Sequence, residues 1–341
     1  MPRTKDLAEY MTSASPQPDV SIVIVSFNTL NVLRECLQSI ERESDGLNVE
    51  IWIVDNNSSD GSPEMIEQEF PHVHLIRSPT NLGFGAANNV ALEKARGRYI
   101  VLLNSDAFFC PNALRLSVKH MDEHPQAGLG GAQLVGRDQS WQPSGRMFPT
   151  VLNDAFVYFG LASRYPASRI FGRLDRTWAD QSVAAEVDWV VGAFSIIRRE
   201  ALAKVGFFDP AFFLYSEEVD LCRRIRAAGY QIWYWPDIVV IHIGGESSRQ
   251  VKTLEMSSTG AQLIRWRMRS TLLYYRKHHG FAAWWSKTLE LTLYKLIVWR
   301  NSFSRDPRRK ARAQEHRNLA ILMRQAWQDT AGGRVSPPRP W

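Results

Sequence analysis

The chain has 341 residues, of which 45% are hydrophobic and 22% charged, an ordinary composition for a globular protein of one large domain with an appendage, or of two domains. Its formal net charge of +6 indicates an anionic partner, such as a membrane surface, a nucleic acid or a phosphorylated substrate. Neither a signal-peptide pattern nor a charge-free run of about 18 apolar residues is present, so we expect a cytosolic active part without a transmembrane helix. The isolated cysteines Cys36, Cys110 and Cys222 predict reduced thiols.

Short apolar runs alternate with helical patterns along the first third of the chain. Residues 1–18 are polar and predict a flexible arm. Strands are expected at 20–26, 49–54, 73–77 and 99–103, with segments of helical periodicity between them. This cadence predicts an α/β fold with a mostly parallel, doubly wound central sheet.

Two of these predicted strands end in acidic turns. The strand at 49–54 runs into Asp55, and the strand at 99–103 runs into Asn104, Ser105 and Asp106. Because the carboxyl ends of parallel strands lie at one edge of the sheet, the two carboxylates are expected to converge on one ligand. A turn cap is the alternative role for either of them, and for nearby Asp60 it is the favoured one.

The middle of the chain is less regular. Residues 137–183 have weak periodicity, which is typical of a substrate loop region with short helices. Further elements are expected as follows: helices at 110–120, 199–205 and 217–228, and strands at 129–135, 186–197, 231–235 and 238–242. This domain is expected to span 19–248.

The C-terminal part is basic and helical. We expect C-terminal helices within 249–303 and a basic, partly disordered tail at 304–341. Residues 284–299 place Trp285, Leu289, Leu293, Leu296 and Ile297 on one side, as in a helix that lies in a membrane surface. The alternatives are packing on the protein's own core or on a second copy in a homodimer.

Six motifs occur in an order that is similar to a known family. They are Val-Ser-Phe-Asn at 25–28, Val-Asp-Asn-Asn-Ser-Ser-Asp-Gly at 54–61, Asn-Leu-Gly-Phe-Gly-Ala-Ala-Asn at 81–88, Leu-Asn-Ser-Asp at 103–106, Phe-Leu-Tyr-Ser-Glu-Glu-Val-Asp-Leu at 213–221, and His242. Together they make residues 20–248 resemble the family 2 glycosyltransferases of GT-A fold, especially the bacterial branch that adds rhamnose to cell-surface polysaccharides.

The resemblance implies a metal site. Asp106 resembles the metal-binding acid of the family's Asp-X-Asp motif, in which Asn104 replaces the first Asp, and His242 resembles the family's distant metal ligand. One carboxylate suits a metal held mainly by phosphates and water, and the expected cofactor is Mn²⁺ or Mg²⁺. A histidine satisfied at a strand end is the alternative for His242.

The resemblance also implies a nucleotide-sugar site. Asp55 is expected to accept the N3–H of uracil or thymine, which cytosine lacks. The glycines at 83 and 85 would let the backbone approach a phosphate or ribose closely. The full set of expected contacts is Ser26, Asn28, Asp55, Asn81, Gly83, Gly85, Asn88, Asn104, Ser105 and Asp106.

The acids at 217–220 are expected to supply the catalytic base. In the family the second acid of a Glu-Asp pair acts, which points to Glu218, with Glu217 as the other candidate because Glu replaces Asp. Stabilisation of the helix dipole is a structural alternative. The spacing of Asp220 and Arg224 favours a salt bridge on one helix face.

The function predicted on this basis is an inverting, metal-dependent glycosyltransferase at the cytoplasmic face of the inner membrane. Its expected partners are a dTDP- or UDP-sugar donor, with dTDP-L-rhamnose favoured, and a glycan acceptor on a polyprenyl diphosphate; no nucleic acid is expected. The two alternatives are a nucleotidyltransferase and a non-catalytic membrane- or nucleic-acid-binding protein. Residues 25–30 lack the Gly-rich, basic loop of a nucleotidyltransferase, and the acids at the strand ends argue against a non-catalytic protein.

Overall fold

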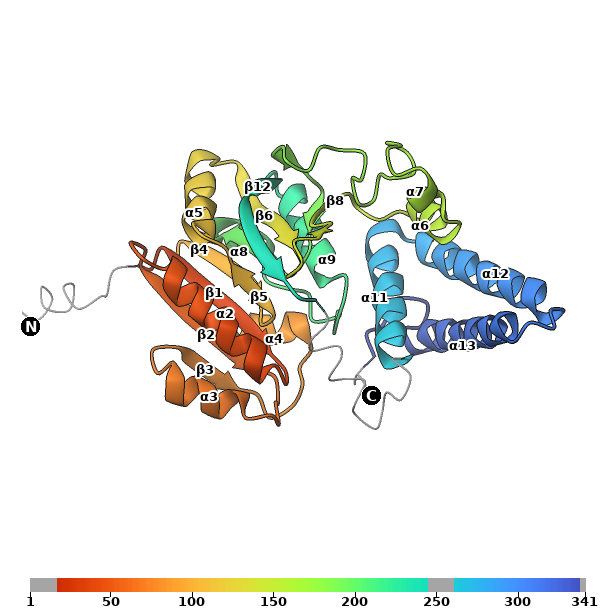
Figure 1. The fold of residues 1–341 in the computed structure, drawn as a ribbon, viewed down its shortest axis with the longest axis horizontal. Coiled ribbons are helices and arrows are strands. Elements are labelled where there is room, and N and C mark those ends of the chain that lie inside the picture. The colour runs from red at the N-terminus through yellow and green to blue at the C-terminus, as the bar shows by residue number, and fades with distance from the viewer. Residues whose placement is uncertain (1–16, 245–260, 338–341) are drawn as a thin grey trace, which may run out of the picture.

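A computed structural model describes residues 17–244 and 261–337 of the chain. Its centre is a mixed sheet with helices on both faces, and three C-terminal helices extend from one side (Figure 1). The main strands, in spatial order, are β3 (His74–Arg77), β2 (Val49–Asp55), β1 (Val20–Ser26), β4 (Tyr99–Asn104), β11 (Phe194–Arg198), β6 (Ala127–Val135), β12 (Gln231–His242) and β5 (Ala107–Phe109). The predicted α/β class with a mostly parallel sheet is confirmed.

The first half of the sheet is parallel, as the sequence predicts. Strand β1 lies between β2 and β4, and both pairs are parallel. The second half is mixed, because β11 runs antiparallel to both β4 and β6, whereas β12 runs parallel to β6. An apolar run alone cannot show whether a strand pairs in the parallel or the antiparallel direction, since a strand buried on both faces has the same composition in either case.

Alternation along β1 divides the core into two layers. Ile22 and Ile24 pack with α2 (Leu30–Glu43), α3 (Ser62–Glu69) and α5 (Ala113–Glu123). Val23 faces the opposite layer, which contains α4 (Phe84–Leu92), α8 (Arg199–Val205) and α9 (Glu217–Ala227). Full burial of each such side chain contributes roughly 1.5–3 kcal/mol to the stability of the fold. Because a shift of one residue would exchange the two faces of β1, burial on both faces fixes the pairing register and the position of the strand ends.

The weakly periodic segment forms short elements, as predicted for a loop region with short helices. They are β7 (Trp141–Gln142), β8 (Gly145–Arg146), α6 (Val151–Tyr158) and α7 (Leu161–Arg164). The strand expected at 186–197 is instead divided into β9 (Ala185–Glu186), β10 (Trp189–Val190) and β11. Thr150 caps α6, with its side chain accepting a hydrogen bond from the backbone N–H of Asn153. The two strands expected around Pro236 are one strand, β12, whose pairing with β6 shifts register between Trp235 and Val239.

The C-terminal helices are α11 (Ala261–His279), α12 (Ala282–Ser302) and α13 (Pro307–Asp329), which pack on one another. The expectation of a partly disordered tail is wrong for residues 307–329. Asp306 caps α13 by accepting from the backbone N–H of Arg308, and at the other end Asp329 binds Arg265 and Arg269 of α11. Composition suggested disorder because these distant partners for Asp329 cannot be read from the local sequence.

Three other predictions have outcomes here. All three cysteines are free thiols, as predicted. Among the helices of residues 17–244 and 261–337, none combines the length and the apolarity needed to cross a bilayer. Most of the predicted N-terminal arm, at 1–16, and the predicted domain boundary near residue 248 lie outside the described residues.

Candidate active site

Strand register brings the predicted acids to one edge of the sheet. Ser26, the last residue of β1, pairs with Asp55, the last residue of β2. On the other side of β1, Val25 pairs with Asn104, so the Asn104–Asp106 turn follows directly beside them. The convergence predicted from the parallel strands is therefore present in the backbone.

Asp55 has one carboxylate oxygen without a partner. The residue is 3% exposed, and its Oδ2 accepts a hydrogen bond of 3.0 Å from the backbone N–H of Ser58. Its Oδ1 is buried and has no hydrogen-bond partner within the described residues. Because a buried acceptor left unpaired is costly, this oxygen indicates a place for an N–H donor of a ligand.

Asp106 and His242 form a second pair at this edge. His242 ends β12 and pairs with Ala107 of β5, which puts its Nε2 3.6 Å from Asp106 Oδ1. Its Nδ1 lies 3.0 Å from Oε1 of Gln142, whose amide nitrogen donates to the His242 carbonyl. Burial lowers the pKa of His242, while the negative charge of Asp106 acts in the opposite direction.

This pair fits a metal held mostly by other ligands. Within the described part of the chain, no group of three or more His, Cys, Asp or Glu side chains is arranged to hold a metal ion. Asp106 and His242 supply one carboxylate and one imidazole, and Gln142 fixes the ring as an outer partner of a ligating histidine does. Such a sparse set suits an ion that keeps waters and substrate phosphates.

Several predicted nucleotide contacts brace the loops at this edge. Asn28, at φ 52°, accepts from the backbone N–H of Ser59 through its side chain. The Asn81 side chain accepts from the Asn56 amide and from the backbone N–H of Gly83. Ser26 shares a hydrogen bond with Thr29. These bonds keep the rim in one conformation, and direct contact with a nucleotide stays a prediction.

The glycines at 83 and 85 approach the protein's own chain. A Cβ on Gly83, whose φ is +82°, would lie 2.2 Å from the carbonyl oxygen of Phe213. A Cβ on Gly85 would lie 3.1 Å from the Cβ of Phe208. Their small size therefore lets α4 pack against the segment that precedes α9, which explains them without a ligand, and their predicted phosphate or ribose contacts stay untested.

Three further polar residues have local roles. Asn88 is 1% exposed and donates to the carbonyl of Phe84 within α4. Ser105 is 3% exposed in the turn after β4. Asp60 accepts from the backbone N–H groups of Leu30 and Ser62, which confirms the expected cap and turn role.

Two unpaired acids open α9. Glu217 is 3% exposed, and the Oε2 atoms of both Glu217 and Glu218 are buried without a hydrogen-bond partner in the described residues. Burial raises the pKa of each, and the charge of Glu218 raises that of Glu217 further. The two preceding residues, Tyr215 and Ser216, have φ of 71° and 69°, a strained backbone of the kind that clusters at functional sites.

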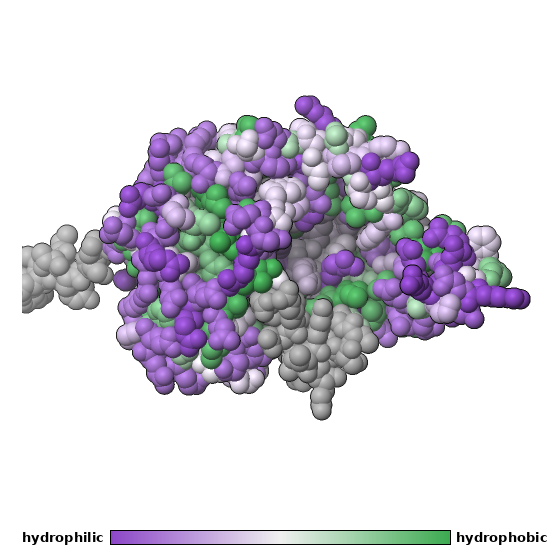
Figure 2. All heavy atoms as spheres, viewed as in Figure 1, coloured by the Kyte–Doolittle hydropathy of each residue, from purple (hydrophilic) through white to green (hydrophobic). Residues whose placement is uncertain are grey.

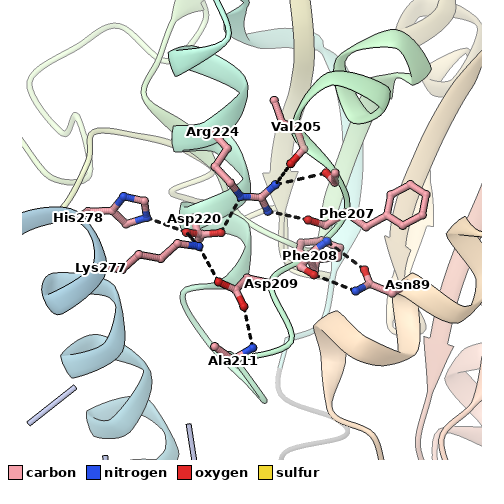
Figure 3. Close-up of polar contacts among 11 residues, drawn as sticks. Asn89, Val205, Phe207, Phe208, Asp209, Ala211, Asp220, Arg224, Lys277 and His278 are labelled. Atoms are coloured by element: carbon pink, nitrogen blue, oxygen red, sulfur yellow. Dashed lines mark hydrogen bonds and ion pairs between the residues drawn. The ribbon is translucent and has the colours of Figure 1, made fainter. Parts of the chain in front are cut away.

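Asp220, one turn later, is fully paired (Figure 3). It accepts from Arg224 of α9 at 2.9 Å, and from Lys277 and His278 of α11 at 2.6 and 2.7 Å. Burial alone would raise the pKa of Asp220, but hydrogen bonds from these three partners outweigh it and lower the pKa to about 2. The predicted salt bridge with Arg224 is confirmed, and the cluster joins α9 to α11.

Sequence reasoning missed Gln142 and Arg146. Both come from the weakly periodic segment, on β7 and β8, and their roles depend on strand pairing that has no local signal. Arg146 forms an ion pair with Asp175, lies 4.9 Å from the Trp189 ring centre, and its charge also acts on Glu218. The positive charge of Arg146 lowers the pKa of Glu218 and so opposes part of the rise that burial causes.

Comparisons with known proteins show which family the sequence resembles. The sequence model of a family described as "Glycosyl transferase family 2" matches residues 21–220. An N-acetylglucosaminyl-diphospho-decaprenol L-rhamnosyltransferase of Mycobacterium tuberculosis is 26% identical over 289 residues, which cover 79% of this chain and 90% of the relative. Rhamnosyltransferase WbbL of Escherichia coli is 26% identical over 268 residues, covering 75% and 92%.

A solved structure shares the fold. The mannosyltransferase PcManGT from Pyrobaculum calidifontis, solved with GDP-Man and Mn²⁺, superimposes with a TM-score of 0.54 at 16% identity. The match covers 95% of this chain and 94% of the mannosyltransferase, so the C-terminal helices fall within the compared length.

Proposed function

The chain belongs to glycosyl transferase family 2, and from that premise we propose that it is an inverting, metal-dependent rhamnosyltransferase that uses dTDP-L-rhamnose and a lipid-linked glycan. The observation that carries the proposal is the set of buried carboxylate oxygens without partners, on Asp55, Glu217 and Glu218. These oxygens have no hydrogen-bond partner within the described residues, as expected where a substrate supplies the missing donors.

The donor follows from Asp55 and from the relatives. A fixed acceptor at Oδ1 suits the N3–H of thymine or uracil and rejects cytosine, which has a lone pair at that position. Two relatives matched over most of their length are named rhamnosyltransferases, which supports rhamnose as the sugar. A relative named for a decaprenyl diphosphate glycan supports a lipid-linked acceptor.

Asp106 and His242 would hold the Mn²⁺ or Mg²⁺ ion, and Gln142 would orient the imidazole. When bound, the ion neutralises negative charge on the departing diphosphate. The mannosyltransferase with the same fold was solved with Mn²⁺, which supports a divalent cation.

Glu218 or Glu217 acts as the base in this proposal. The acceptor hydroxyl forms a bond to the anomeric carbon and gives its proton to the carboxylate, while the anomeric carbon–oxygen bond breaks and its electron pair leaves with the nucleoside diphosphate. A raised pKa makes a carboxylate a stronger base near neutral pH. A single displacement inverts the anomeric configuration.

A lipid-linked acceptor places the enzyme on the cytoplasmic face of the inner membrane, where it would associate peripherally. Activity as a monomer or as a homodimer is compatible with this proposal, because the acids and the Asp106–His242 pair all come from one chain.

The test is transfer by the purified chain to a polyprenyl-diphosphate glycan from a panel of dTDP-, UDP-, GDP- and CMP-sugars, with Mn²⁺, Mg²⁺ or a chelator. We expect product from dTDP-L-rhamnose with a divalent ion only, and an anomeric configuration opposite to that of the donor. A sugar nucleotide formed from a nucleoside triphosphate and a sugar phosphate would instead identify a nucleotidyltransferase.

A further inference from the structure

Helix α12 exposes several large apolar side chains and buries several polar ones. The residues that it turns toward the protein include Ser286, Glu290 and Asn301, which are 1%, 3% and 4% exposed. Along the outside, Trp285 is 58% exposed and Trp299 is 64% exposed. A helix on the surface of a water-soluble protein has the opposite arrangement.

The five most exposed large apolar residues of α12 and its two ends lie on one stripe. Positions 281, 285, 288, 292, 296, 299 and 303 recur every three or four residues, so they lie on one side of a helix. We call this set the outer stripe; its apolar members are Phe281, Trp285, Leu296, Trp299 and Phe303, and threonines occupy 288 and 292. The stripe runs the full length of α12.

The polar side of α12 is satisfied where it lies. Glu290 accepts a 2.7 Å hydrogen bond from the Tyr294 hydroxyl, and Asn301 donates at 2.8 Å to the carbonyl of Ile297. Burial raises the pKa of Glu290, which reduces the energetic cost of keeping this acid inside. Tyr158 also hydrogen-bonds to Glu290, which links the buried side of α12 to α6, and the outer stripe needs another apolar environment.

The exposed apolar residues are confined to one part of the molecule. Among the described residues, large hydrophobic side chains with high exposure occur at 152–183 and 281–335, and none occurs at 17–151. An apolar groove of about 640 Å³ between α6 and α12 joins the two groups, with Leu152 and Trp285 on its walls. The apolar surface thus extends from the outer stripe to α6.

Positive charge is concentrated at one end of this surface. Residues 295–312 contain seven of the 41 Lys and Arg residues but only one of the 35 Asp and Glu residues, so they account for the whole net charge of +6. All seven cations are exposed, at the α12–α13 junction, and Figure 2 shows hydrophilic residues gathered at that end of the molecule.

We propose that the outer stripe of α12 docks on an anionic membrane surface, with the cations of residues 295–312 against the lipid headgroups. Exposed Trp and Phe beside a cluster of Lys and Arg is the composition of an interfacial helix. A second copy would present the same cations and not the negative charge that complements them, so the charge favours an anionic lipid surface over a second copy. The inference deepens the proposed function, because it names the surface that reaches the membrane of the lipid-linked acceptor.

The test is flotation of the full chain with vesicles of phosphatidylcholine alone or mixed with phosphatidylglycerol, without acceptor or donor. We expect binding only to the anionic vesicles, weakened by salt, and about tenfold weaker in the Leu296→Ser/Trp299→Ser variant. The single variant Leu296→Ser should also weaken binding, and Ile321→Ser on α13 is its matched control, since Ile321 is 50% and Leu296 51% exposed.

Charge variants test the second half of the proposal. Arg309→Glu should weaken binding to anionic vesicles, whereas Lys119→Glu on α5, at the other side of the molecule, should not (Figure 1). Equal binding to both vesicle types, equal loss in the control variants, or a dimer that the stripe variant dissociates would overturn the proposal.

Donor hydrolysis, measured in parallel without vesicles, separates the two proposals. Vesicle binding without any sugar-nucleotide turnover would reject the proposed function and leave the docking surface in place. Turnover without vesicle binding would reject the docking surface alone.

Discussion

The first turn of α9 carries two kinds of acid in two different surroundings. Asp220 has three hydrogen-bonding partners from two helices and a pKa lowered to about 2. The Oε2 atoms of Glu217 and Glu218 are buried without a hydrogen-bond partner in the described residues, and burial raises the pKa of each acid. Because all three stand within four residues of one another, their difference comes from neighbours and not from the helix terminus that they share.

The contrast separates an acid that joins two helices from two acids with unpaired oxygens, which are the candidates for the proposed base. Asp220 ties α9 to α11, and so anchors the C-terminal helices to the sheet domain. Glu217 and Glu218 contribute no such link and lower the stability of the empty protein when ionised. Proteins commonly accept this cost at active sites.

The largest effect should come from removing the base. Glu218→Gln or Glu217→Gln, whichever is the base, should reduce turnover by about 10²–10⁴-fold, because an amide cannot accept the acceptor's proton. Single-turnover transfer measures this, with donor affinity checked by calorimetry. Donor binding should be nearly unchanged; a loss of donor binding equal to the loss of turnover would point to a binding role.

Asp220→Ala should be the most destabilising of these changes. Asp220 is fully buried and accepts hydrogen bonds from Arg224, Lys277 and His278, so removing its carboxylate takes one partner from each of them. A hydrogen bond to a charged group typically contributes about 1.5–3 kcal/mol. Urea denaturation measures the free energy of unfolding. Asp138→Ala, at an exposed turn, is the control and should unfold like the wild type. If Asp220→Ala lowers the free energy of unfolding no more than Asp138→Ala does, Asp220 does not have the structural role assigned to it.

Asp55→Asn extends the comparison to the third unpaired acid. The substitution replaces a charged acceptor with an amide, which has only one uncharged acceptor oxygen and also carries an NH2 donor. We therefore expect the binding free energy of dTDP to weaken by about 1–3 kcal/mol. Calorimetry with dTDP and CMP compares the two bases. Unchanged dTDP binding together with continued rejection of CMP would exclude Asp55 as the residue that reads the base.

The smallest effect is in the pH dependence of stability, where the two kinds of acid have opposite signs. The lowered pKa of Asp220 gives stability that is present above about pH 4 and lost as the pH falls toward 2. The raised pKa values of Glu217 and Glu218 reduce stability as the pH rises above about 4, through their folded-state pKa values. Urea denaturation across this range measures the free energy of unfolding at each pH. In Glu217→Gln the fall in stability above about pH 4 should be smaller than in the wild type. The same pH dependence in both proteins would contradict this prediction.

Much of the site was predictable because it lies where the chain pattern is strong. Strand ends placed Asp55 and Asp106, and helical spacing paired Asp220 with Arg224. Lys277 and His278 could not be assigned to Asp220, because they come from another helix more than 50 residues away. The helical spacing of α12 indicated an apolar side, but only tertiary packing reveals that Glu290 is buried and Trp285 exposed.

The central claim is that one of the two glutamates that open α9 is the catalytic base, whereas their neighbour Asp220 has a structural role. The most direct measurement is turnover with dTDP-L-rhamnose for Glu217→Gln, Glu218→Gln and Asp220→Asn, each normalised to the folded fraction at the assay temperature. The account predicts that at least one Glu variant is fully folded and nearly inactive, and that Asp220→Asn loses activity only in proportion to its loss of folded protein. Full turnover in both folded Glu variants would contradict it.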